Sequence, residues 1–147
     1  MNNKSKNKNQ DLLCCMFENS TAGLFAINKV LERCDDENFK KELYEQRDNY
    51  KNFAKDSFLE LHRRGLKEPR LSTSTKMMMG GKIKMNMRMS DKPSHLADMM
   101  IKGTNMGVLA LNKELNHSKG ADKSCIDNAQ KMLKAEENYM NRLKTYL

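Results

Sequence analysis

The sequence has little of what a β-rich or membrane-spanning protein needs. It contains no Trp, only 2 Pro and 7 Gly, and aromatic residues make up 6% of its 147 residues. A β-sandwich or β-barrel normally needs more turn residues and more aromatic or β-branched strand residues. The uncharged runs are also too short to form a transmembrane helix. These absences favour an all-helical chain, long enough for one domain with one hydrophobic core.

Cysteine is sparse and lacks the spacing of a structural zinc site. The four Cys, at positions 14, 15, 34 and 125, form no Cys-x-x-Cys pair. The N-terminus is polar and basic with no long apolar stretch behind it, which is not typical of a secretory signal. We therefore expect a cytoplasmic protein whose thiols are reduced.

The net charge of +8 is unevenly distributed along the chain. Residues 1–10 contribute three Lys, and residues 66–92 contain seven basic side chains against two acidic ones. Residues 1–9, rich in Asn and Lys, are predicted to form a disordered basic tail. Such segments attract phosphates, so a weak, non-specific polyanion binder is one alternative. Nucleic acid is nevertheless not an expected partner, because no aromatic residues accompany these Lys residues to stack on bases.

Apolar residues recur at intervals of three and four in four segments, which is typical of amphipathic helices. We predict helices over residues 10–34, 37–64, 93–117 and 122–146. Asp35 or Asp36 is expected to cap the second helix, and Gly65 to end it in a left-handed conformation. The third helix is predicted to bury one stripe, widened by Met100, Gly107 and Leu111; its members are Leu96, Met99, Gly103, Met106, Ala110 and Lys113.

The connections between the predicted helices are short, long and short. Residues 66–92 form the long one, and 27 residues easily span a helix that is about 37 Å long. We therefore predict that residues 10–147 form an all-α four-helix bundle, ferritin-like, with one long crossover at 66–92 between the second and third helices. The alternative is an up-down-up-down bundle with a loose connection.

Two stretches give the chain a resemblance to a known group. They are the Met-rich KMMMGGKIKMNMRMSDKPSHLADMMIKGTNMG (76–107) and the closing KAEENYMNRLKTYL (134–147). With these motifs, which belong to a pattern covering most of residues 10–147, the chain resembles a family of small bacterial proteins with a ferritin-like helical bundle. The resemblance implies a fold and no particular reaction.

The metal ligands of a di-iron bundle are incomplete. Such a site needs one Glu from each of two helices and a Glu-x-x-His from each of the other two. The sequence has one Glu-x-x-His, formed by Glu114 and His117 at the end of the third helix, so ferroxidase chemistry is not expected. Glu136 is predicted to point inward near the middle of the fourth helix. It is then a charge partnered by Lys29, Arg47 or Lys113, a residue rotated to the edge of the stripe, or a metal ligand or general base.

A second metal hypothesis depends on the crossover. With that topology, one end of the bundle would hold Cys14, Cys15, His62, Glu114, His117 and Cys125. Sulfur and imidazole are ligands for Zn²⁺ or Cu⁺. A metal-binding bundle without ferroxidase chemistry is therefore an alternative function, and otherwise no cofactor is expected.

Two further features predict an interaction surface. Flexible Met side chains adapt to partners, and the candidates are Met77, Met79, Met85, Met87 and Met89. Gly103 and Gly107 lie on one face of the third helix, where small residues admit a ligand or a partner helix, or pack against the rest of the bundle. No nucleophile, phosphate-loop or dinucleotide motif occurs, so an enzyme is not expected. The prediction is a non-enzymatic interaction or structural protein that associates with itself or with another protein.

Overall fold

The computed structural model describes residues 2–67, 69 and 90–147, which form four long helices. α1 spans Asn3–Leu31, α2 spans Glu37–Arg63, α4 spans Pro93–His117, and α5 spans Lys123–Leu143 before the short 3-10 helix η1 over Lys144–Tyr146. No strand occurs in these described ranges, so the predicted all-α four-helix bundle is confirmed. The crossover residues 70–89, including the five Met proposed as an interaction surface, lie outside the described residues.

Helix α1 begins earlier than the sequence pattern predicted. Residues 3–9 were expected in a disordered tail, but they form the first turns of α1, capped by the Asn2 side chain. Asn9 is fully buried and accepts a hydrogen bond of 2.7 Å from the backbone N–H of Asp122. This tertiary contact orders a segment whose composition alone favours disorder, and the prediction for residues 3–9 is wrong.

The boundaries of α2 follow from its capping residues. The Asp36 carboxylate accepts a hydrogen bond of 2.7 Å from the Phe39 backbone N–H, which satisfies a free donor of the first turn. At the other end Gly65 has a positive φ of 65°, and the Leu66 N–H bonds back to the Leu61 carbonyl at 2.9 Å. This is the left-handed glycine cap that the sequence predicted.

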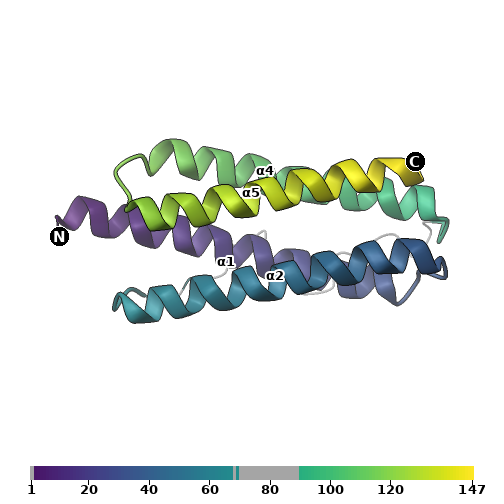
Figure 1. Ribbon diagram of the computed structural model, residues 1–147, viewed down its shortest axis with the longest axis horizontal. Helices are drawn as coiled ribbons and strands as arrows, with labels where there is room; N and C mark the ends of the chain where they lie inside the picture. The colour runs from purple at the N-terminus through teal and green to yellow at the C-terminus, as the bar shows by residue number, and fades with distance from the viewer. Residues whose placement is uncertain (1, 68, 70–89) are drawn as a thin grey trace.

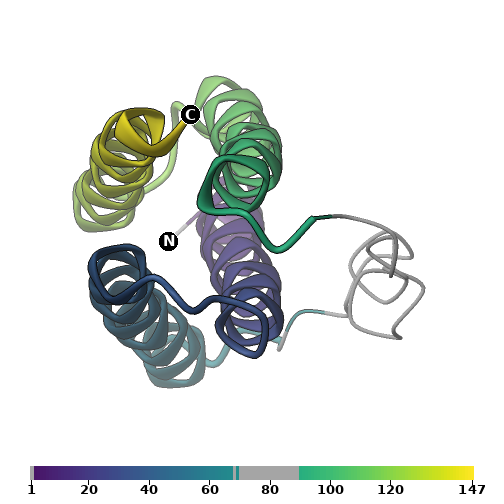
Figure 2. The same ribbon diagram turned by 90° about the vertical axis from the view of Figure 1, so that its right-hand side faces the viewer.

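The long connection joins two helices that run in the same direction, as predicted. Figure 1 shows α1 and α5 running in one direction and α2 and α4 in the other, so that α2 ends far from the start of α4. Ion pairs agree with this arrangement, because Arg64 after α2 bonds Asp122 before α5, and Arg33 after α1 bonds Asp91 before α4. Viewed end-on in Figure 2, α1 lies beside both α2 and α4. The up-down-up-down alternative is therefore wrong.

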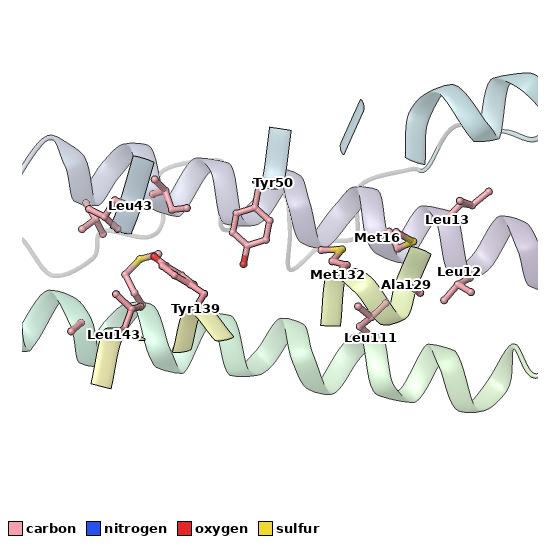
Figure 3. Close-up of a cluster of buried hydrophobic side chains, with 14 of the residues drawn as sticks. Leu12, Leu13, Met16, Leu43, Tyr50, Leu111, Ala129, Met132, Tyr139 and Leu143 are labelled. Atoms are coloured by element: carbon pink, nitrogen blue, oxygen red, sulfur yellow. The ribbon is translucent and has the colours of Figure 1, made fainter. Parts of the chain in front are cut away.

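The hydrophobic core consists of apolar side chains contributed by all four helices. In Figure 3, Tyr50 reaches from α2 into the bundle between two apolar groups, one around Leu43, Tyr139 and Leu143 and the other around Met16, Ala129 and Met132. The middle of the bundle is therefore one place where polar groups enter the core. None of the described helices has an apolar stretch long enough to cross a membrane.

Candidate functional site

A buried carboxyl group lies at the middle of the bundle. Glu136 of α5 is 1% exposed, and its Oε1 accepts a hydrogen bond of 3.1 Å from the Tyr50 hydroxyl of α2. Within the described residues, Glu136 Oε2 is buried without a hydrogen-bond partner. Burial raises the pKa of this carboxyl to about 7, although the Tyr50 bond opposes the rise. Glu136 is therefore largely protonated below neutral pH.

Two glycines make room for this pair. A Cβ on Gly23 of α1 would lie 2.3 Å from the Tyr50 ring, so no other residue fits there without moving the ring. A Cβ on Gly107 of α4 would lie 3.2 Å from Glu136 Oε1. The Asn19 side-chain amide donates to the Gly107 carbonyl at 2.9 Å and links α1 to α4 in the same layer. We call Asn19, Gly23, Tyr50, Gly107 and Glu136 the central layer.

The three cations proposed as partners of Glu136 lie elsewhere. Lys29 pairs with Glu32, Arg47 stacks on the Tyr44 ring at 4.8 Å, and Lys113 is exposed on α4. The inward orientation of Glu136 is confirmed, but its observed partner is a neutral tyrosine. The expected ion pair is thus wrong, because Lys29 and Lys113 are exposed to water and Arg47 packs on the Tyr44 ring.

The candidate metal ligands do not gather into a site. In the part of the chain that the structure describes, no group of three or more His, Cys, Asp or Glu side chains is placed to hold a metal ion. Glu114 accepts from the Ser118 hydroxyl at 2.7 Å, and His117 Nδ1 lies 2.7 Å from the Lys113 carbonyl. His62 is exposed and Cys125 is buried.

The thiols at this end are also poor metal ligands. Burial raises the pKa of Cys14 to about 11 and that of Cys15 to about 12, and nearby carboxylates add to both shifts. A metal must displace the proton of a thiol that binds it, so a raised pKa weakens metal binding at these side chains. Cys14 Sγ instead lies 3.9 Å from the Lys67 carbonyl as a weak donor.

The buried face of α4 differs from the predicted stripe. Leu96 is buried as expected, but Gly103, Met106, Ala110 and Lys113 face the solvent. The residues that α4 buries are Leu96, Ala97, Met100, Thr104, Val108 and Leu111. This face places larger apolar side chains in the core and leaves the Lys113 ammonium in water.

The two glycines of α4 therefore have different surroundings. Gly107 packs against the central layer, whereas a Cβ on Gly103 would meet no atom within 4 Å. Gly103 lies instead in an exposed apolar surface with Met106, Leu109 and Ala110, which we call the α4 face. Met106 is 65% exposed and Leu109 is 54% exposed. Single exposed apolar side chains are common on protein surfaces, but neighbouring ones indicate a surface that a partner can cover.

Gly23 of the central layer and Leu109 of the α4 face were not predicted from the sequence. Gly23 gave a signal, since a glycine in the middle of a long helix is unfavourable unless packing requires it. Leu109 gave none, because its exposure depends on how α4 rotates against its neighbours.

Comparisons with known proteins gave no match. No family model, curated protein or solved structure matches this chain. The resemblance to small ferritin-like bundle proteins therefore stays a prediction.

Proposed function

We propose that this protein is a non-enzymatic interaction protein that associates with a second copy of itself through the α4 face. The observation that carries the proposal is the exposed apolar surface formed by Gly103, Met106, Leu109 and Ala110 on a well-packed helix. Removing such a surface from water is favourable by about 25 cal/mol for each Å² of apolar area buried.

The α4 face is suited to pairing with itself. In a two-fold interface the same patch serves both copies, so residue i meets residue j and j meets i. When two α4 helices run antiparallel about an axis midway between Gly103 and Ala110, at the level of Met106 and Gly107, helical geometry brings Gly103 opposite Ala110 of the second copy. Both residues are small, which allows the two helix backbones to approach closely.

Charges beside the α4 face support the same pairing. Asp98 lies eight residues before Met106 and Lys113 lies seven residues after it. Antiparallel pairing therefore brings each Asp98 near the Lys113 of the other copy. Asp98 bonds Lys102 at 2.6 Å within its own helix, while Lys113 has no ion pair with a described carboxylate. Two symmetric ion pairs at the rim would favour this orientation over the parallel one.

The test is the mass of the protein in solution as a function of concentration. Sedimentation equilibrium of the wild type is expected to show a reversible rise in mass towards that of a dimer. Leu109→Glu places a charge in the apolar surface and is expected to keep the protein monomeric at every concentration.

Leu59→Glu is the matched control, because Leu59 on α2 is 52% exposed and lies outside the α4 face. It is expected to associate as the wild type does. A monomeric wild type, or equal losses of association in both variants, would overturn the proposal.

A further inference from the structure

The two ends of the bundle differ in charge, which the sequence alone does not show. The central layer divides the described chain into two halves. One half, residues 3–18, 51–67 and 108–135, contains 13 basic and 7 acidic side chains. The other half, residues 20–49, 90–106 and 137–147, contains 9 basic and 10 acidic ones. The crossover topology brings the basic segments together, because α1 begins where α2 and α4 end (Figure 1).

The first turns of α1 hold their lysines in fixed positions at the basic half. Ser5 and Asn9 both bond Asp122, and a Cβ on Gly120 would lie 3.1 Å from Lys8 Nζ, so α1 packs against the connection between α4 and α5. Figure 1 shows the start of α1 reaching past the end of α2 and past that connection. Lysines expected in a disordered tail thus lie on a helix that packs against the rest of the bundle.

Three carboxylates at this end are already paired with cations. Glu60 bonds both Arg63 and Arg64, and these bonds lower its pKa to about 2. Asp122 pairs with Arg64, and Asp127 with Lys123. Several exposed lysines here have no ion pair to any described carboxylate, and four of them, Lys4, Lys6, Lys67 and Lys119, lie nearest the tip of this end. Their charge is available to an external anion.

We propose that this basic end, formed by Lys4, Lys6, Lys67 and Lys119, binds the phosphate backbone of double-stranded nucleic acid without regard to sequence. Phosphates recur along a duplex at intervals that several fixed cations can contact at once. No large exposed apolar side chain lies among the described residues 3–10, 62–67 or 113–123, so this end has nothing to insert into a lipid bilayer. It also has no aromatic platform for bases, which restricts recognition to the backbone.

Salt dependence is the first part of the test. The full-length protein is titrated into a labelled DNA duplex of arbitrary sequence, and binding is followed by fluorescence anisotropy. Contact with about four phosphates predicts that affinity falls about 100-fold between roughly 50 and 200 mM salt.

Two triple variants with the same loss of charge locate the surface. In the first, Lys4, Lys6 and Lys119 become Gln, and affinity at low salt is expected to fall roughly tenfold or more, with a flatter salt dependence. In the second, Lys41, Lys92 and Lys144 become Gln; these exposed lysines lie at the opposite end, and affinity is expected to stay within about twofold of the wild type. Helical circular dichroism checks that both variants fold.

Three results would overturn the proposal. Equal losses in the two triple variants would show that net charge alone drives binding, and unchanged affinity in both would place the binding elsewhere. Binding to phosphatidylcholine vesicles that contain phosphatidylserine, with no binding to the duplex, would assign the surface to a membrane. The proposal is independent of self-association, because Leu109→Glu leaves all four lysines in place.

Discussion

At the residue scale, the unusual group is the Glu136 carboxyl in the middle of the bundle. Its folded-state pKa of about 7 exceeds its ordinary value of 4.5, so the folded protein holds this proton more tightly than the unfolded chain does. The free energy of unfolding contributed by Glu136 is therefore greatest below pH 4.5. It is lost as the pH rises towards about 7, by about 3 kcal/mol in total.

Glu136→Gln is expected to remove this pH dependence. The amide cannot ionise, and its oxygen can still accept the Tyr50 hydroxyl bond. Urea unfolding at a series of pH values measures the free energy of unfolding of wild type and variant. As the pH rises from about 4.5 to 7, the wild type should lose stability relative to the variant. Glu137→Gln keeps the Glu136 carboxyl and removes only a neighbouring charge, which adds less than burial does to the raised pKa of Glu136, so it should give a much smaller shift in relative stability. A constant difference for Glu136→Gln would contradict the assignment.

The glycine beside Tyr50 is a second residue whose role can be tested. Gly23→Ala places a Cβ 2.3 Å from the Tyr50 ring, and the ring is buried and unable to move freely. We expect a loss of about 1–3 kcal/mol in the free energy of unfolding. Thermal and urea denaturation measure it.

Gly103→Ala is the control for this prediction, since its Cβ would meet nothing within 4 Å. Alanine is the better helix former, so this variant should gain about 0.5–1 kcal/mol. If both variants change stability in the same direction, close packing against Tyr50 is not the reason for glycine at position 23.

At the element scale, the start of α1 depends on a contact distant in the sequence. Asn9 accepts from the Asp122 backbone N–H and is fully buried, so Asn9→Ala leaves that donor without its partner. We expect a loss of about 1–2 kcal/mol in stability and faster amide exchange in the first turns of α1. Hydrogen exchange measures both effects.

Asn7→Ala, at an exposed position of the same turns, should change stability by less than about 0.5 kcal/mol. Equal effects of the two substitutions would mean that helix propensity, and not the Asp122 contact, orders these turns.

The second feature at this scale is the rotation of α4 about its axis, which determines the face that the helix buries. The predicted stripe and the observed one share Leu96, Met100 and Leu111, and the observed one buries Val108 as well. The predicted stripe supplies the exposed Met106 of the α4 face, and Leu109, which was not predicted, is exposed one turn further on. α4 has more apolar residues than the bundle core can bury. The apolar residues that stay exposed form a surface that a partner can cover.

At the scale of the whole molecule, the crossover determines which segments meet. It brings the start of α1 together with the end of α2 and the turn between α4 and α5, as the Arg64–Asp122 and Asn9–Asp122 contacts show. The same arrangement gathers the unpaired lysines at one end. Both proposed surfaces therefore depend on tertiary structure, the α4 face through helix rotation and the basic end through topology.

Much of the fold was determined by the sequence itself. Apolar spacing of three and four residues specified four helices, and Asp36 and Gly65 specified the limits of α2, because capping depends on local backbone groups. The length of the connection between α2 and α4 indicated the crossover. The inward position of Glu136 also followed from its place in the repeat.

Tertiary structure alone decided three features: the order of residues 3–9, the rotation of α4, and the partner of Glu136. Each depends on a contact between segments far apart in the sequence, such as Asn9 with Asp122 or Tyr50 with Glu136. Helical periodicity in the sequence indicates which residues lie on the same face of a helix. Which face is buried, and against which side chain, is settled by the free energy of packing all four helices together.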